Sequence, residues 1–148
     1  MALDASITID IDAPPEIVWG VIRDVERWPE WTPSVTSIRR LDGGPLVVGS
    51  RARVRQPRLP PAEWRVTALE DGRGFVWITR SPGVVVTARH SVEPRSGGSR
   101  ASLSVEFAGL LGSLVARLTR TLNERYLRLE AEGLKRRSEE RRASGGTS

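Results

Sequence analysis

Cysteine is absent from this chain of 148 residues, and its absence excludes several kinds of chemistry. Without a thiol there is no cysteine nucleophile, no zinc site with cysteine ligands and no disulfide framework. The single histidine, His90, also excludes a site in which two histidines bind one metal ion. We therefore expect neither a metal nor a cofactor. A chain of this length buries enough surface to fold without them.

Long apolar runs are missing as well. No run approaches the roughly 18 to 20 residues that a transmembrane helix needs. Residues 1–11 carry Asp4 and Asp10 in place of the basic and apolar regions typical of a signal peptide. We expect a soluble, cytoplasmic protein with a single domain over residues 1–142. The small, polar residues 143–148 are predicted to form a flexible tail.

Lysine is scarce, because Lys135 is the only lysine among 23 basic residues. The net charge of +5 and the sequence pI of about 11.0 raise the question of nucleic-acid binding. Much of this pI reflects the high pKa of arginine, and the charged run at residues 135–142 mixes both signs, as solvated helix ends do. We therefore do not expect a nucleic-acid partner.

Alternation of apolar and polar residues is the main structural signal. Residues 5–11 alternate as in a half-buried strand, and Pro14 and Pro15 then favour the start of a short helix over residues 16–23. A second short helix or turn is expected at residues 28–31. Further strands separated by turn residues are predicted at 35–41, 50–56, 63–70, 75–80, 84–93 and 100–108. Short connections between them favour an antiparallel meander.

A helical period follows the last strand. Apolar residues recur at spacings of three and four, which predicts one long helix from residue 110 to about residue 142. The predicted apolar stripe consists of Leu111, Val115, Leu118, Leu122, Tyr126 and Leu129. The fold class is therefore α+β, with a curved antiparallel sheet closed by a long C-terminal helix and an apolar pocket between them.

Two polar residues fall on the predicted inner face of the sheet. Gln56 shares its face with Ala52 and Val54, while His90 shares its face with Ala88 and Val92. A buried polar group costs about 1 to 3 kcal/mol when it lacks a hydrogen-bond partner. Each residue is satisfied either by the protein itself or by a ligand in the pocket. The sequence leaves both interpretations open.

Tryptophan is unusually frequent, with five residues against one tyrosine and two phenylalanines. Trp19 is expected to pack against the sheet, and Trp28 and Trp31 to form a structural clasp around Pro29. Trp64 and Trp77 lie on strands and are candidates for either the core or the pocket wall. Indole provides a large apolar area and one N–H donor in both roles.

The N-terminal third carries a family resemblance. Residues 11–19 read Ile-Asp-Ala-Pro-Pro-Glu-Ile-Val-Trp, and residues 21–31 read Val-Ile-Arg-Asp-Val-Glu-Arg-Trp-Pro-Glu-Trp. These segments, with the glycines before a long final helix, resemble the polyketide cyclase/dehydrase and lipid-transport group of the START-like, or SRPBCC, superfamily. The resemblance implies a helix-grip fold in which a seven-stranded sheet wraps around the final helix and two short helices close one end of a hydrophobic cavity.

Members of that superfamily bind lipids, steroids, polyketides or other apolar molecules, and some are aromatases or cyclases. They share no single catalytic motif, so the resemblance transfers no catalytic residue to this chain. The chain has no Gly-x-Ser-x-Gly motif, no glycine-rich phosphate loop before a helix, and no evident carboxylate cluster among the predicted inner-face positions.

Three functional hypotheses remain. The first is binding of an apolar or amphipathic small molecule, with Gln56, Trp64, Trp77 and His90 on the pocket wall. The second is a cyclase or dehydratase in which His90 acts as general acid or base and Arg125, at the edge of the helical stripe, assists; the alternative for Arg125 is a charge in water. The third is an interaction module that uses the basic surface of Arg51, Arg53 and Arg55 or the C-terminal arginines to bind RNA, an acidic protein or a membrane. The sequence specifies neither the ligand nor the oligomeric state.

Overall fold

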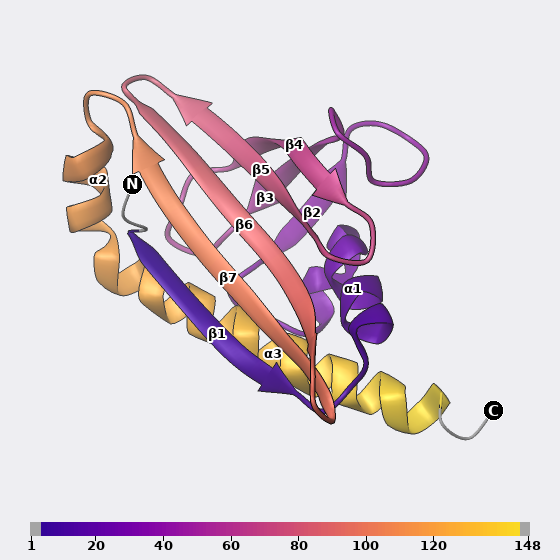
Figure 1. The fold of residues 1–148 in the computed structure, drawn as a ribbon. Coiled ribbons are helices and arrows are strands. Elements are labelled where there is room, and N and C mark those ends of the chain that lie inside the picture. Colours follow the sequence, from indigo (N-terminus) through magenta and orange to yellow (C-terminus); the bar gives the residue numbers. More distant parts are fainter. Residues whose placement is uncertain (1–3, 146–148) are drawn as a thin grey trace.

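A computed structural model describes residues 4–145 and shows a curved sheet packed against a long helix (Figure 1). The seven strands are β1 (Ala5–Ile11), β2 (Ser37–Arg40), β3 (Arg51–Arg55), β4 (Ala62–Glu70), β5 (Gly74–Ser81), β6 (Val84–Arg95) and β7 (Gly98–Ala108). The helices are α1 (Pro15–Arg23), the 3-10 helix η1 (Val25–Glu30), α2 (Gly112–Leu118) and α3 (Arg120–Gly145). The predicted α+β architecture, with two short helices after the first strand, is confirmed.

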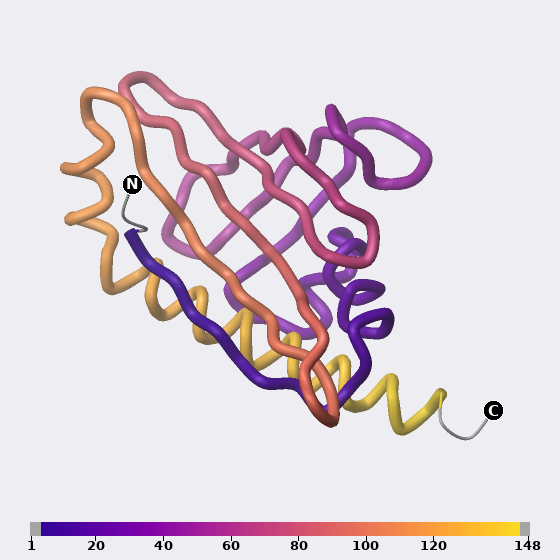
Figure 2. The backbone as a smooth tube through the Cα atoms, in the orientation of Figure 1, coloured from indigo at the N-terminus to yellow at the C-terminus, as the bar shows by residue number. Residues whose placement is uncertain are grey.

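The strands form one antiparallel sheet in the order β1-β7-β6-β5-β4-β3-β2. Strands β2 to β7 pair consecutively, as the short connections predicted, and β1 pairs with β7. Figure 2 shows the backbone of this sheet curving around the space occupied by the helices. In the β6–β7 pair, His90 lies opposite Leu103 and Ala88 opposite Val105, so these side chains share the concave face.

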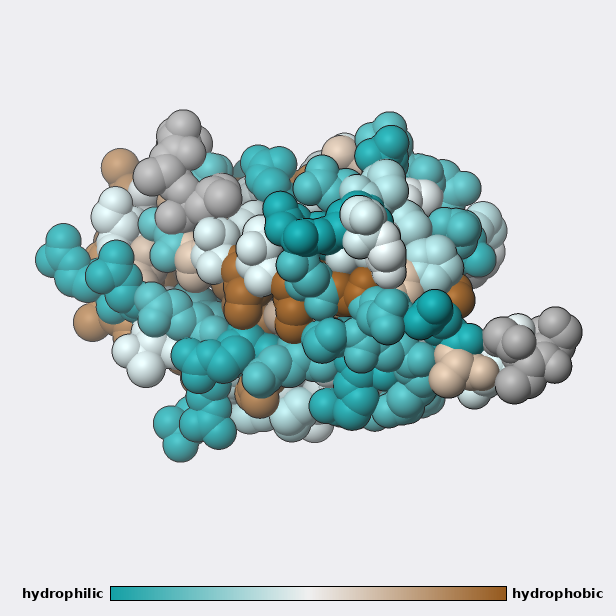
Figure 3. Space-filling model, turned by 60° about the horizontal axis from the view of Figure 1, so that its bottom comes forward, coloured by the Kyte–Doolittle hydropathy of each residue, from teal (hydrophilic) through white to brown (hydrophobic). Residues whose placement is uncertain are grey.

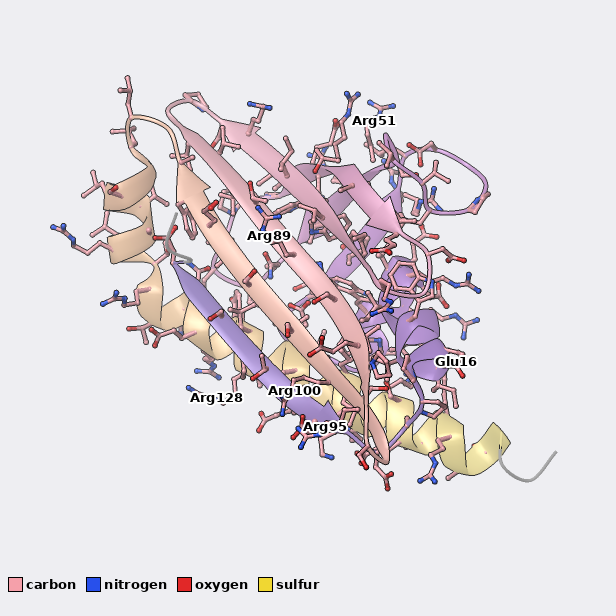
Figure 4. All side chains as sticks on the ribbon, viewed as in Figure 1. Glu16, Arg51, Arg89, Arg95, Arg100 and Arg128 are labelled. Carbon is pink, nitrogen blue, oxygen red and sulfur yellow. The ribbon has the colours of Figure 1, made fainter. Side chains whose placement is uncertain are left out.

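Arginines of β3, β6 and β7 lie on the other face of the sheet. Arg53 and Arg55 are exposed, whereas Ala52 and Val54 are buried on the concave face. Arg89 and Arg100 extend from the outer face of the sheet in Figure 4. Alternation along the strands therefore separated the two faces correctly.

The C-terminal segment differs from its prediction, because it forms two helices instead of one. Helix α2 ends at Leu118, and α3 begins at Arg120 with a visible change of direction (Figure 1). The hydroxyl of Thr119 donates a hydrogen bond to the carbonyl of Val115 at 2.7 Å. Such a bond to the preceding turn bends helices, and the branched Cβ of threonine also disfavours a regular helix. Helix α3 continues to Gly145, three residues beyond the predicted domain boundary, and residues 146–148 lie outside the described part of the chain.

The predicted stripe on this segment was wrong in its N-terminal half. Leu111 and Leu118 are exposed, because the direction of the helix changes at Thr119 and α2 approaches β7 through Gly112 instead. The buried face of α3 instead consists of Tyr126, Leu127, Glu130, Ala131, Gly133, Leu134 and Ser138. Three of these residues are small and one is charged, so hydrophobicity alone did not identify the face.

Two contacts hold the C-terminal half of α3 close to the rest of the fold. Glu139 accepts hydrogen bonds from the Lys135 ammonium at 2.5 Å and the Asp12 backbone N–H at 2.9 Å, which hold the pKa of its carboxyl below the ordinary value. Gly133 lies against Trp31, so that a Cβ atom there would overlap the carbonyl oxygen of Trp31. The helix can approach this closely only because the residue lacks a side chain.

The substitution Gly133→Ala is expected to destabilise the protein by about 1 to 3 kcal/mol. Alanine would normally favour a helix, but the overlap with Trp31 forces α3 away from the core. Urea denaturation gives the free energy of unfolding, with Gly20→Ala in α1 as the matched control, because nothing lies within 4 Å of a Cβ there. Equal stability of the Gly133→Ala protein and the wild type would contradict the close packing.

Candidate functional site

A cavity of about 430 Å³ lies between the concave face of the sheet and the two C-terminal helices. Strand β6 contributes Val84, Val86, Ala88 and His90, whose side chains alternate onto this face. At about 3.3 Å per residue, the distance along the strand from Val84 to His90 is about 20 Å. Val92, the next residue on the same face, is part of the core and does not line the cavity. His90 therefore marks its closed end.

The open end of the cavity, called the mouth below, is formed by Pro60, Pro61, Glu63, Arg80 and Ser81. All five residues are exposed to solvent. Pro60 and Pro61 belong to the loop between β3 and β4, and Arg80 and Ser81 belong to the β5–β6 hairpin. The Tyr126 hydroxyl of α3 donates a hydrogen bond to the carbonyl of Pro57, which fixes the same loop against the helix.

A buried ionisable pair occupies the closed end. His90 Nε2 and Glu130 Oε1 lie 3.1 Å apart and share a hydrogen bond, with the residues 6% and 8% exposed. This contact connects β6 to α3 through the interior. When Glu130 is ionised and His90 neutral, Nε2–H donates to the carboxylate and Nδ1 carries the lone pair. Nδ1 is itself buried and has no hydrogen-bond partner within residues 4–145.

Aromatic rings surround the imidazole of His90. Phe75 stacks on it at a centroid distance of 4.8 Å, Trp28 lies at 5.0 Å, and Trp77 meets it edge-on at 6.1 Å. Trp64 extends the group, because its ring lies 5.5 Å from that of Trp77. These four residues, Trp28, Trp64, Phe75 and Trp77, are called the aromatic cluster below. The cluster excludes water from the histidine and restricts its orientation.

Four of the five residues proposed from the sequence line the cavity: Gln56, Trp64, Trp77 and His90. Gln56 donates its amide N–H to the carbonyl of Ser34 at 3.2 Å, so the protein itself satisfies part of this side chain. Arg125 is exposed and is not part of the cavity wall, which agrees with the alternative of a charge in water. A direct role for any of them in ligand binding stays a prediction.

Trp28, Tyr126 and Glu130 are the cavity residues with functional potential that the sequence did not identify. Trp28 was interpreted as part of a clasp; its Nε1–H does donate to the carbonyl of Ile22, but its ring also lines the cavity. Tyr126 was assigned only to the helical stripe. Glu130 was missed because it looked like one more charge on a charged helix. Its spacing of three from Leu127 and four from Leu134 was the available signal, since it places Glu130 on the buried face.

The curved seven-stranded sheet, the C-terminal helix and the cavity between them define a helix-grip fold. The chain belongs to the polyketide cyclase / dehydrase and lipid transport family, whose model matches residues 2–139. The resemblance seen in the N-terminal segments is thereby confirmed. A search of curated protein sequences gave no significant match.

Solved structures share the fold at low sequence identity. The Zhui aromatase/cyclase from Streptomyces sp. R1128 is 18% identical, with a TM-score of 0.77 over 95% of this chain and 96% of the other. TTHA0849 from Thermus thermophilus is 17% identical, with a TM-score of 0.72 over 97% and 99%. Ara h 8.0201 is 15% identical, with a TM-score of 0.64 over 88% and 95%. At these identities the likeness establishes the fold alone.

None of the helices in residues 4–145 combines the length and the apolar character needed to cross a membrane. Within the same residues, no three histidine or acidic side chains come together in a way that could hold a metal ion.

Removing the carboxylate of Glu130 should lower the free energy of unfolding by about 1 to 3 kcal/mol, since His90 Nε2 would then be buried without a partner. Urea denaturation of Glu130→Ala tests this. Glu130→Gln retains a hydrogen-bonding group and should lose less. Glu132→Ala, on the exposed side of the same helix, should change the stability by less than about 0.5 kcal/mol. Equal effects of the Glu130→Ala and Glu132→Ala substitutions would refute a structural role for the pair.

Proposed function

We propose that the protein binds an apolar or amphipathic small molecule, such as a lipid, a polyketide or an aromatic compound, in the cavity between the sheet and α3. The observation that carries the proposal is the buried His90–Glu130 pair at the closed end of an otherwise largely apolar cavity. A small rotation of the imidazole would bring its buried, unpartnered Nδ1 to the cavity, where a hydroxyl group on the ligand would donate a hydrogen bond to it.

The size and lining of the cavity support this proposal. Its volume of about 430 Å³ lies within the range of roughly 300 to 1,000 Å³ that is common for small-molecule sites. Trp28, Trp64 and Trp77 of the aromatic cluster line the cavity and offer flat apolar surfaces next to the polar pair. A ligand with an apolar body and one polar end fits this distribution, because its polar end meets His90 and its body meets the indole rings.

Filling the cavity should abolish binding. Val86→Trp places a large side chain inside it, whereas Val85→Trp, one residue earlier on β6, places the same side chain on the outer face. The neutral probe 1-aminoanthracene should gain emission with the wild type and with Val85→Trp. Its affinity for Val86→Trp should be at least roughly tenfold weaker.

The natural ligand can be sought with the same three proteins purified from the native host. Native mass spectrometry should reveal an adduct on the wild type and on Val85→Trp but not on Val86→Trp, and extraction would identify the compound. The binding proposal is wrong if the wild type carries no adduct and also fails to increase the emission of the probe.

Catalysis is a second candidate, favoured by the contact between His90 and Glu130. Glu130 would hold the imidazole with Nε2 protonated and Nδ1 basic, so that Nδ1 could accept a proton from the carbon next to a substrate carbonyl. The resulting imidazolium could return that proton to a departing β-hydroxyl group, which leaves as water. The balanced reaction is a dehydration, in which a C–H and a C–O bond break, a C=C bond forms and the histidine is regenerated.

If the protein is such an enzyme, His90→Ala should reduce kcat by about 10² to 10⁴-fold toward a genuine substrate. Glu130→Gln should reduce kcat less, because an amide still positions the ring but provides no negative charge for the imidazolium. Binding of 1-aminoanthracene serves as the control for an intact cavity. Unchanged turnover by a correctly folded His90→Ala protein would exclude this mechanism.

A further inference from the structure

Helix α2 and the two residues before it carry four leucines that are at least about half exposed. Leu110 is 100% exposed, Leu118 74%, Leu114 51% and Leu111 47%. These four residues are called the leucine face below. Leu111, Leu114 and Leu118 are spaced by three and four residues and therefore share one side of the helix. Figure 3 shows apolar atoms among hydrophilic ones at the end of the molecule where α2 lies.

The leucine face lies next to the mouth of the cavity. Leu111 donates its backbone N–H to the carbonyl of Gly83 at 2.9 Å, which attaches α2 to the β5–β6 hairpin. Val115, which neighbours Leu111 and Leu118 on the helix, and Thr119 at the bend line the cavity. A partner that bound the leucine face would therefore also lie next to the mouth, through which a ligand enters the cavity.

The segment that begins with these leucines has an excess of positive charge. Residues 110–129 contain four arginines, Arg117, Arg120, Arg125 and Arg128, but a single glutamate, Glu124, which lies 4.0 Å from Arg120. Arg128 extends from α3 away from the sheet in Figure 4. Within residues 4–145, the side chains of Arg117, Arg125 and Arg128 form no ion pair. At the mouth itself, the exposed cation Arg80 is accompanied by the exposed carboxylate of Glu63, so the excess positive charge lies on α2 and α3. A binding partner that complements the leucine face and these arginines consequently has a surface that is both apolar and negatively charged.

We propose that the leucine face and the neighbouring arginines dock the protein onto the surface of an anionic lipid bilayer, with the mouth facing the membrane. Leucines on one side of a short helix enter the boundary between headgroups and acyl chains, and arginines next to them bind lipid phosphates. An anionic bilayer supplies both complementary features in one surface. An apolar ligand would then pass between the bilayer and the cavity without crossing water. This inference rests on the proposed function and adds the bilayer as the source of the ligand.

Co-sedimentation with vesicles tests this proposal. The wild type should bind vesicles that contain phosphatidylglycerol and phosphatidylcholine much more strongly than vesicles of phosphatidylcholine alone. The double variant Leu114→Ser/Leu118→Ser should bind at least roughly tenfold more weakly, because two apolar side chains no longer enter the bilayer. Arg117→Gln/Arg120→Gln should lose roughly fivefold per arginine at low salt and less at high salt.

Matched controls are available elsewhere on the surface. Val47 and Val48 are 51% and 59% exposed in the loop before β3, and Val47→Ser/Val48→Ser should leave vesicle binding unchanged. Arg53→Gln/Arg55→Gln removes the same charge from the outer face of β3 and should have a much smaller effect than Arg117→Gln/Arg120→Gln. All variants should retain the far-UV spectrum of the wild type and its affinity for 1-aminoanthracene.

The outcomes separate this proposal from the proposed function. Vesicle binding without probe binding would support the docking surface and contradict the ligand-binding cavity. Probe binding without vesicle binding, or vesicle binding that the leucine substitutions leave unchanged, would overturn the docking proposal. It would also be overturned if sedimentation velocity showed a dimer that dissociates on Leu114→Ser/Leu118→Ser and no binding to vesicles, since a second copy would then cover the leucine face.

Discussion

One helix has to cover the concave face of a seven-stranded sheet, and most of the structure follows from how it does so. A helix is about 10 Å wide, so it cannot fill the whole space inside a curved sheet. In its C-terminal half, α3 carries Ala131, Gly133 and Ser138 and lies directly against Trp31 and the first strand. Toward its N-terminus, Tyr126 and Asn123 line the cavity instead. The same helix therefore packs tightly against the fold at its C-terminal end and lines a cavity at its N-terminal end.

The transition between these two regions lies at Glu130. Its carboxylate meets His90 where the close packing ends and the cavity begins. A charged side chain is seldom buried without a partner, and the imidazole is the partner that it has here. The pair consequently stabilises the position of α3 on the sheet and also gives the cavity a polar end. These two roles make Glu130 and His90 the residues on which both functional proposals depend.

The fold could be predicted from the sequence because each local signal was strong. Strict alternation in β1, β6 and β7 identified the concave face, and glycine- and proline-containing turns separated the strands. The same alternation located His90 and Gln56 on the inner face before any contact was known. Residues 11–31 identified the superfamily, and with it the two short helices after the first strand.

The features that the sequence did not predict depend on contacts between segments that are distant in the chain. The bend at Thr119 results from a side-chain hydrogen bond that apolar periodicity does not reveal, and it sends the leucines of α2 to the surface. Gly133 and Ser138 do not resemble buried positions until Trp31 is known to lie against the helix. The role of Glu130 depends on its contact with His90, which is 40 residues away in the chain. Pairing across the fold, unlike alternation within a strand, leaves little trace in a single sequence.

The most direct test of this account is a crystal structure of the protein with 1-naphthol, which combines an aromatic body with one hydroxyl group. The binding proposal predicts electron density in the cavity, with the naphthol rings against Trp28, Trp64 or Trp77 and the hydroxyl within about 3 Å of His90. It would be contradicted by a cavity that holds no ligand at saturating 1-naphthol, or by a ligand whose hydroxyl lies at the mouth, away from His90 and Glu130.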